Sequence, residues 1–378
     1  MKPKKKNATT SPKIRFGVIG LGHIAQVAVL PAFAHAKKDV ELAALISSDA
    51  KKLATLKKKY KVPLAFSYEQ FDACLDSGAI DALYIALPNT EHADYAERAL
   101  KKGVHVLCEK PLAMTEKDCA RLIKAAEKNN VKLMTAYRLH FDGANLKAIH
   151  VAKERLGELR FFNSSFSYQI EDQDNIRLRK EEGGPLWDIG IYCLNAARYF
   201  FRAEPTEVTA LSAAGDSARF REVPETVAVS MKFPKDRLAS FVVSFGSEAS
   251  ASYEVVGTKG RLRLEAAYEY AYPREMEVVV NYKTQNFRFK KVDQFAPELI
   301  YFANCIRENR EPEPSGLEGL ADVRILLAIE ESLRRGKAVS LATPAALIRK
   351  ARPKLKQAMR RPPVSEPRVV DVDAPSGS

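Results

Sequence analysis

The chain has 378 residues, of which 46% are hydrophobic, with a formal net charge of +13 and five cysteines. Its length favours two domains over one, and its scattered cysteines, without a CxxC pair, argue against a disulfide framework or a zinc site. No apolar run is long enough to span a membrane and no secretion signal is recognisable, so we expect a cytoplasmic protein with no metal and no membrane partner.

The positive charge is concentrated at the two ends of the chain. Residues 1–15 carry a net charge of +6 and residues 344–378 carry +5, so the body between them is nearly neutral. We therefore expect a basic tail at residues 1–13 and a basic, proline-rich tail at residues 344–378, both disordered. The tails almost lack aromatic residues on which bases could stack, which disfavours a nucleic-acid partner.

The first predicted strand leads into a glycine-rich turn. An apolar run at residues 14–19 is followed directly by Gly20, Leu21, Gly22, His23, Ile24 and Ala25, and then by helical periodicity to residue 36. In such a turn the first glycine permits a tight bend and the second lets the backbone approach a pyrophosphate, which the N–H groups at the helix start would bind. We therefore assign Gly20, Gly22, His23 and Ile24 to a dinucleotide site; a plain glycine turn is the alternative.

Strands and helices then alternate as far as residue 138. Strands are predicted at residues 14–19, 40–47, 79–87, 105–108 and 132–136. Helices are predicted at residues 24–36, 50–60, 68–75, 93–102 and 116–129. This alternation predicts an α/β fold, with a doubly wound parallel Rossmann sheet in a domain at residues 14–138. A ligand would bind at the carboxyl ends of its strands.

The end of the second strand bears on the choice of cofactor. An acidic side chain there would bind the 2′-hydroxyl of NAD. Here Ser47 is followed by Asp49, Lys51 and Lys52. Ser47 and Lys52 suit a 2′-phosphate and favour NADP over NAD, whereas Asp49 favours NAD. The alternative is that the two lysines are solvent-exposed residues of a helix and bind no cofactor.

The pattern changes in a second domain, expected at residues 139–343. A helix at residues 144–155 precedes strands at 158–170, 206–214, 224–234, 238–247, 251–257, 260–266 and 276–291. Further helices are predicted at residues 186–201, 298–308 and 322–335. These elements predict a large, mostly antiparallel open sheet with helices on one face. Its other face would need cover, which favours a homodimer or homotetramer built through this sheet.

Three side chains could carry proton chemistry. Lys110 ends the fourth strand and precedes Pro111, while Asp188 and Tyr192 are four residues apart on one face of a predicted helix. A phenol is a poor base at neutral pH unless a neighbouring cation stabilises its anion. Lys110 could provide that cation, and Asp188 could orient Lys110 or the substrate. Taken separately, these residues could equally form a surface lysine and an ordinary helix-face hydrogen bond.

Several short motifs together carry a family resemblance. They are Gly20-Leu21-Gly22, Pro88-Asn89-Thr90-Glu91-His92, Cys108-Glu109-Lys110-Pro111-Leu112, Tyr137-Arg138 and the run from Gly183 to Tyr192. Over residues 14–340 the chain resembles the Gfo/Idh/MocA oxidoreductases, most closely their glucose–fructose oxidoreductase branch. The resemblance implies a Rossmann domain, an oligomerising open sheet, and active-site roles for Lys110 and Asp188. That branch has tyrosine where many relatives have histidine, which supports Tyr192 as the proton carrier.

The resemblance implies further residues that contact the cofactor and the substrate. Cofactor-binding positions beyond the glycine turn and the second strand are Tyr68, Leu87, Pro88, Asn89, His92, Glu109, Lys110, Arg138 and Trp187. The expected substrate contacts are Lys110, Arg138, Asp188 and Tyr192. The branch is exported through a twin-arginine signal and has a long N-terminal arm. This chain shows neither, so an exchangeable cofactor is as well supported as a retained one.

These observations favour an NADP-dependent oxidoreductase acting on the CH–OH group of a sugar or polyol. Tyr192 would move the proton, Lys110 would stabilise the alkoxide and Asp188 would position the pair. The alternative is a non-catalytic NADP-binding regulator, against which the presence of all three side chains argues.

Overall fold

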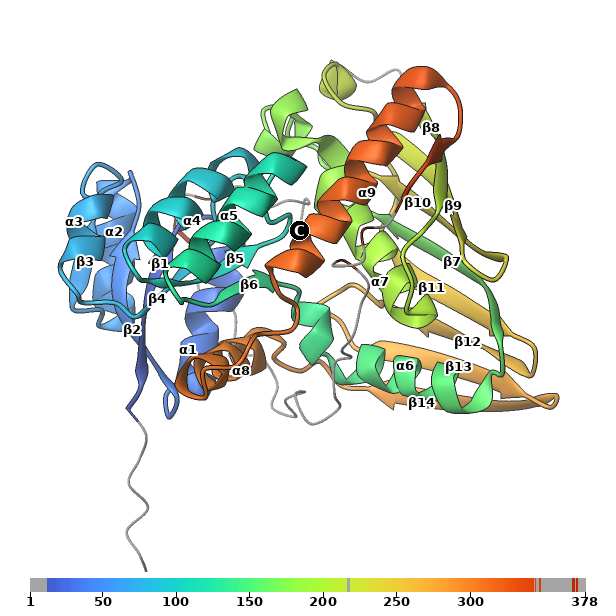
Figure 1. The fold of residues 1–378 in the computed structure, drawn as a ribbon, viewed down its shortest axis with the longest axis horizontal. Coiled ribbons are helices and arrows are strands. Elements are labelled where there is room, and N and C mark those ends of the chain that lie inside the picture. Colours follow the sequence, from blue (N-terminus) through green and yellow to red (C-terminus); the bar gives the residue numbers. More distant parts are fainter. Residues whose placement is uncertain are drawn as a thin grey trace, which may run out of the picture.

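The computed structural model describes residues 12–215 and 218–342, together with residues 344, 347, 369, 370 and 372. The tails predicted at 1–13 and 344–378 lie almost entirely outside these residues. The described chain forms two sheets, the first with helices on both faces and the second with helices on one (Figure 1). None of its helices combines the length and the apolar character that crossing a membrane would require.

The first sheet has six parallel strands in the order β3-β2-β1-β4-β5-β6, which confirms the doubly wound prediction. The strands are β1 (Ile14–Ile19), β2 (Val40–Ile46), β3 (Leu64–Phe66), β4 (Ala82–Ile85), β5 (His105–Glu109) and β6 (Leu133–Ala136). Their connections contain η1 (Ala25–Val29), α1 (Leu30–Ala36), α2 (Ala50–Tyr60), α3 (Phe71–Asp76), η2 (Asn89–Glu91), α4 (His92–Lys101) and α5 (Glu116–Lys128). Strands β4 and β6 are buried throughout because helices cover both faces. The three-residue edge strand β3 was not predicted.

The second sheet has nine strands in the order β14-β13-β12-β11-β7-β10-β9-β8-β15. Only the β7–β10 pair is parallel, so the prediction of a mostly antiparallel sheet is confirmed. The strands are β7 (Leu159–Ser167), β8 (Glu207–Ala213), β9 (Thr226–Phe233), β10 (Arg237–Ser244), β11 (Ser250–Gly257), β12 (Gly260–Glu265), β13 (Arg274–Val280), β14 (Lys283–Phe289) and β15 (Val339–Ser340).

The single strand predicted at residues 276–291 is wrong. The structure has a hairpin there, because β13 and β14 pair antiparallel and leave only Asn281 and Tyr282 between them. Both residues have positive φ, 51° and 61°, as the two central residues of a type I′ turn do. The prediction missed the turn because a tyrosine rarely adopts this conformation and no glycine marks the site.

Helices cover one face of the second sheet. The covering helices are α6 (Gly143–Arg155), η6 (Leu186–Gly190), α7 (Ile191–Phe201) and α9 (Gly316–Arg335). The short helices η3 (Arg138–Phe141), η4 (Ile176–Leu178), η5 (Lys180–Glu182) and η7 (Ala218–Phe220) lie in the connections. Helix α9 begins six residues before the predicted start at residue 322. Figure 1 shows α7 and α9 on the inner side of the sheet, with no described helix on the outer side. The outer side exposes Phe161, Leu211, Leu238 and Val242.

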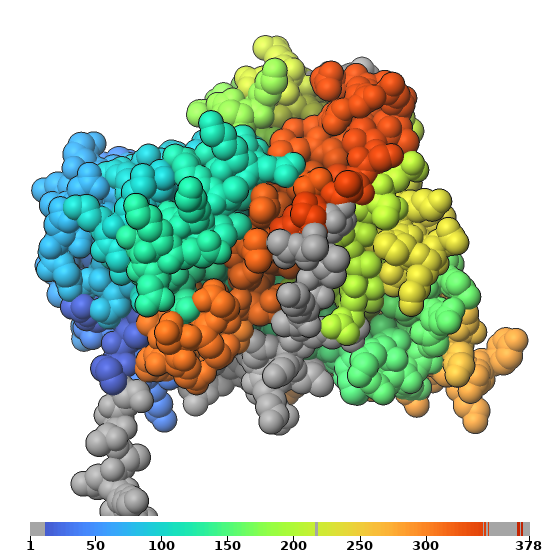
Figure 2. Space-filling model, in the orientation of Figure 1, coloured from blue at the N-terminus to red at the C-terminus, as the bar shows by residue number. Residues whose placement is uncertain are grey.

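The last helices join the two halves. Helix α8 (Phe295–Arg307) packs with α1 in the core of the first domain. In Figure 2 the orange and red elements lie in the seam between the blue–teal half and the green–yellow half.

A buried ionic network fixes this seam. Arg198 of α7 is fully buried and pairs with Glu204, Glu318 and Asp322. The hydroxyl of Tyr137, at the end of β6, donates to Asp322. Burial raises the pKa of Asp322 to about 6, although the charge of Arg198 opposes the rise. Because α7 continues directly from η6, the network holds Asp188 and Tyr192 against the ends of the parallel strands.

Candidate active site

The turn after β1 has the geometry of a phosphate-binding loop. Gly20 has a φ of +85°, and a Cβ there would lie 2.4 Å from the carbonyl oxygen of Ala86, so only glycine fits. A Cβ on Gly22 would meet nothing within 4 Å, which leaves the backbone open to a ligand on that side. His23 and Ile24 follow at the start of the helix, the end at which the helix dipole favours an anion. The residues of this turn therefore fit a dinucleotide pyrophosphate.

The corner after β2 brings Ser47, Asp49 and Lys52 together. Ser47 is buried, and its hydroxyl oxygen accepts from the backbone N–H of Asp49 at 3.2 Å. The Asp49 carboxylate caps α2 by accepting from the backbone N–H of Lys52 at 3.0 Å. The Lys52 ammonium lies 3.8 Å from the same carboxylate. Asp49, the residue that argued for NAD, is therefore engaged as a helix cap.

His92 contacts both of the loops that follow β4 and β5. The ring of His92 is buried, with Nδ1 2.7 Å from the carbonyl oxygen of Pro111 and Nε2 2.9 Å from that of Leu87. Burial lowers the pKa of His92. Both ring nitrogens are thus occupied by backbone, and His92 connects the ends of two adjacent strands. Pro88 begins the turn between Leu87 and His92.

Asn89 is held by the second domain. Its backbone N–H donates to Glu182 Oε2 at 2.7 Å, and its side-chain amide donates to the Glu182 carbonyl oxygen at 3.0 Å. Thr90 donates to the other Glu182 oxygen at 2.9 Å. The loop that was expected to contact the cofactor is thereby also a contact between domains. Tyr68 lies further out on the same domain, with its ring centroid 5.7 Å from that of Tyr95.

Lys110 and Asp188 meet across the two domains. The Lys110 ammonium donates to Asp188 Oδ1 at 2.8 Å and to the Asp188 carbonyl oxygen at 2.7 Å. Burial by itself lowers the pKa of Lys110, but the negative charge of Asp188 and the nearby Tyr192 outweigh it, so that pKa is raised. Lys110 is therefore held as a cation with a fixed direction.

The second carboxylate oxygen of Asp188 also accepts hydrogen bonds from the protein. It accepts from the Tyr168 hydroxyl at 2.8 Å and from Arg177 Nε at 3.2 Å. Burial favours a raised pKa for Asp188, but the charges of Lys110 and Arg177 prevail and hold its pKa well below the ordinary value. Asp188 is thus an anion committed to its three protein donors, which suits positioning rather than proton transfer.

Tyr192 lies next to this pair. The Lys110 ammonium is 5.0 Å from the centre of the Tyr192 ring and the Arg138 guanidinium is 4.9 Å from it, both within the range of cation–π attraction. Arg138 is itself buried and donates to Gln294 Oε1 at 2.7 Å and to the Tyr268 carbonyl oxygen at 2.5 Å. The structure therefore brings together Lys110, Arg138, Asp188 and Tyr192, the four predicted substrate contacts.

Two other predicted residues point into the protein. The Trp187 side chain is buried and its indole N–H donates to Glu330 on α9 at 2.7 Å. Glu109 accepts from the Tyr84 hydroxyl at 2.8 Å, and burial raises the pKa of Glu109. Both side chains are therefore engaged by contacts within the protein, next in the chain to Asp188 and Lys110.

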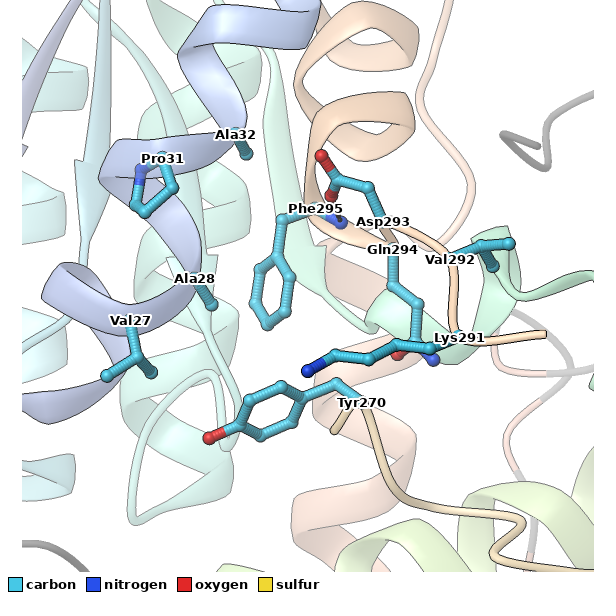
Figure 3. A pocket seen from close by; sticks show the side chains of 10 residues that line it. All are labelled: Val27, Ala28, Pro31, Ala32, Tyr270, Lys291, Val292, Asp293, Gln294 and Phe295. Carbon is cyan, nitrogen blue, oxygen red and sulfur yellow. Dashed lines mark hydrogen bonds between the residues drawn. The ribbon is translucent and has the colours of Figure 1, made fainter. Parts of the chain in front are cut away.

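A pocket lies between the helix that follows the glycine turn and the second domain (Figure 3). Its walls are Val27, Ala28, Pro31 and Ala32 on one side, and Tyr270 with residues 291–295 on the other. The Tyr270 ring centre is 5.2 Å from the guanidinium of Arg138, which connects the pocket to Tyr192.

Sequence reasoning missed Arg177, Tyr270 and Gln294. Tyr270 and Gln294 belong to the second domain and lie far along the chain from Arg138, which both contact. Arg177 lies only 11 positions before its partner Asp188. No motif or periodicity marks these three residues, since their contacts depend on tertiary packing.

Comparison with known proteins gives a consistent result. A family model described as an oxidoreductase family with an NAD-binding Rossmann fold matches residues 14–137, and the GFO/IDH/MocA C-terminal domain model matches residues 148–263. The chain is 31% identical to an NADP(+) D-xylose 1-dehydrogenase of Haloarcula marismortui over 347 residues, which cover 89% of this chain and 96% of that protein.

Two solved structures have the same fold over nearly their whole length. An aldose–aldose oxidoreductase from Caulobacter crescentus, in complex with glycerol, has a TM-score of 0.83 and 35% identity, covering 87% of this chain and all of that one. A 3-ketoreductase from Actinomadura kijaniata, in complex with NADP and TDP-benzene, has a TM-score of 0.77 and 26% identity, covering 85% of this chain and 98% of that one.

Proposed function

Because this chain belongs to the Gfo/Idh/MocA family of oxidoreductases, we propose that it transfers a hydride between NADP and a CH–OH carbon of a sugar or polyol. The observation that carries the proposal is the Lys110–Asp188 contact of 2.8 Å beside the ring of Tyr192. It places a fixed cation and a phenol together at the carboxyl ends of parallel strands, where such sheets bind dinucleotides.

Each protein group has a separate task. NADP, when bound, supplies or accepts the hydride. In the oxidative direction Tyr192 takes the proton of the substrate hydroxyl, and the Lys110 ammonium stabilises the negative charge that develops on the substrate oxygen. Asp188 keeps Lys110 charged and oriented, and Arg138 holds the ring of Tyr192. In the reductive direction Tyr192 returns the proton.

The proposed cofactor contacts follow the same logic. Gly20, Gly22, His23 and Ile24 would hold the pyrophosphate, and Ser47 with Lys52 would hold the 2′-phosphate. The engagement of Asp49 as a helix cap supports NADP over NAD, because its carboxylate already accepts from the backbone N–H of Lys52. The NADP named for the xylose dehydrogenase and found with the 3-ketoreductase supports the same choice.

The open sheet supports a homo-oligomer. Phe161 and Leu238 are register partners on β7 and β10, and both are exposed on the outer side of the sheet together with Val242 and Leu211. Covering such a row of apolar side chains with a second copy removes them from water. The molecular mass in solution tests this inference.

The function is tested by following reduced nicotinamide with aldoses, ketoses and polyols. Sugar-dependent formation or consumption of NADPH, lost in Lys110→Ala, would support the proposal. A copurifying cofactor that is reduced by one sugar and reoxidised by another would establish sugar–sugar dismutation. Binding of NADP without turnover of any substrate would instead favour the non-catalytic regulator.

A further inference from the structure

A residue near the C-terminus is bound by the dinucleotide-binding helix. Gln26 of η1 is buried, and its side-chain amide donates to the carbonyl oxygen of Val370 at 2.9 Å. Its Oε1 accepts from the backbone N–H of Val370 at 2.8 Å. The two residues are 344 positions apart in the chain, so the contact is not a product of local structure.

The contact has the pattern of a strand pairing. One amide side chain satisfies both backbone polar groups of a single residue, as an adjacent strand would. The side chain of Val370 packs against the apolar cluster that contains Ala25, Ala28 and Val29, whereas its neighbour Val369 is 41% exposed. This combination of paired backbone and buried side chain is how extended segments are recognised by folded domains.

The same side chain reaches the phosphate-binding turn. The Gln26 amide also donates to the carbonyl oxygen of Leu21 at 2.8 Å, between Gly20 and Gly22 of the glycine turn. Gln26 therefore hydrogen-bonds the C-terminal segment and the turn at once. An ordered turn binds a ligand more tightly because less conformational freedom is lost on binding.

We propose that Gln26 and the adjoining surface of η1 form a docking site for the chain's own segment around Val370, and that the docked segment slows release of the dinucleotide. The inference rests on the proposed NADP site, and it makes the C-terminal segment a determinant of how long the cofactor stays bound. Because coupling between two binding events is reciprocal, bound NADP must in turn stabilise the docked segment.

The test uses the full chain loaded with NADPH and measures its release by stopped-flow fluorescence after mixing with excess NADP. Val370→Pro removes the N–H that Gln26 accepts and leaves the folded domains untouched. We expect this variant, and a chain ending at residue 366, to release NADPH roughly three- to tenfold faster, as expected for the loss of one or two net hydrogen bonds. The exposed Val369→Ala serves as the matched control and should behave like the wild type.

A second readout tests the reciprocal effect. The peptide bond after Arg368 is a trypsin site, and NADP should slow its cleavage in the wild type but not in Val370→Pro. Unchanged release rates in both variants would overturn the docking proposal while leaving turnover and the proposed function intact. A wild-type chain that binds no NADPH would instead overturn the proposed function. Release rates that depend on protein concentration would mean that the segment comes from a second copy and refute docking within one chain.

Discussion

Replacement of Asp188 by asparagine separates positioning from proton transfer at this site. The substitution keeps the shape of the side chain but removes the negative charge that Lys110 and Arg177 share. The side chains of Lys110 and Asp188 are only 10% and 21% exposed, so water replaces that charge poorly. Burial then acts on Lys110 against weaker opposition, and the pKa of its ammonium group falls.

The size of the expected shift in the pKa of Lys110 follows from the geometry of its contact with Asp188. An opposite charge in direct contact with a partly buried group shifts its pKa by about 1–3 units, or about 1.4–4 kcal/mol. In the wild type the pKa of Lys110 is raised, so the ammonium persists throughout the neutral range. In Asp188→Asn the ammonium should lose its proton at a pH lower by about 1–3 units. The alkaline limb of the kcat profile for carbonyl reduction should move down by the same amount.

The assay is the initial rate of NADPH oxidation at saturating substrate, measured as a function of pH. Asp174→Asn, an exposed carboxylate in the neighbouring loop, is the matched control and should leave the profile unchanged. Thermal unfolding of each variant shows whether lost activity reflects lost folding. An alkaline limb that coincides in the wild type and in Asp188→Asn would refute the assignment of Asp188 as the group that keeps Lys110 charged.

Three further substitutions test the site and its support. Tyr192→Phe keeps the ring between its cationic neighbours but removes the hydroxyl, so kcat should fall about 10²- to 10⁴-fold with little change in the affinity for NADP. Lys52→Ala should weaken NADP binding about tenfold and leave NAD binding unchanged, as titration of each cofactor would show. Arg198→Met leaves the buried carboxylates of the seam without their cation, and urea unfolding should show a loss of about 3–5 kcal/mol.

Each of these three substitutions has a matched control substitution elsewhere in the chain. Tyr272→Phe and Lys58→Ala change exposed residues of the same types and should leave kinetics and binding unaffected. Arg335→Met breaks a surface pair and should cost at most about 1 kcal/mol. Equal losses of kcat in Tyr192→Phe and its control, or equal affinities for NADP in Lys52→Ala and wild type, would contradict the assigned roles. Full stability of Arg198→Met would show that the network does not hold the seam.

The parallel sheet and the glycine turn were predictable because their causes are local. Apolar runs of four to eight residues that alternate with helical periodicity have one common solution, a doubly wound sheet. Gly20 is required by a positive φ, a property of one residue and its immediate backbone. The hairpin of β13 and β14 shows the limit of this reasoning, since Tyr282 adopts a positive φ that tertiary context imposes.

The sequence identified part of the candidate active site but not its geometry. Lys110, Asp188 and Tyr192 were identified by their chemical types, but the separation of 78 positions between Lys110 and Asp188 gave no distance. The bond from Arg177 to the second oxygen of Asp188 depends on packing within the second domain. The bond between Gln26 and Val370 depends on where the C-terminal segment lies. Periodicity and turn chemistry act over a few residues and therefore determined the elements of this protein. Contacts between distant elements depend on packing, and only the tertiary structure decided them.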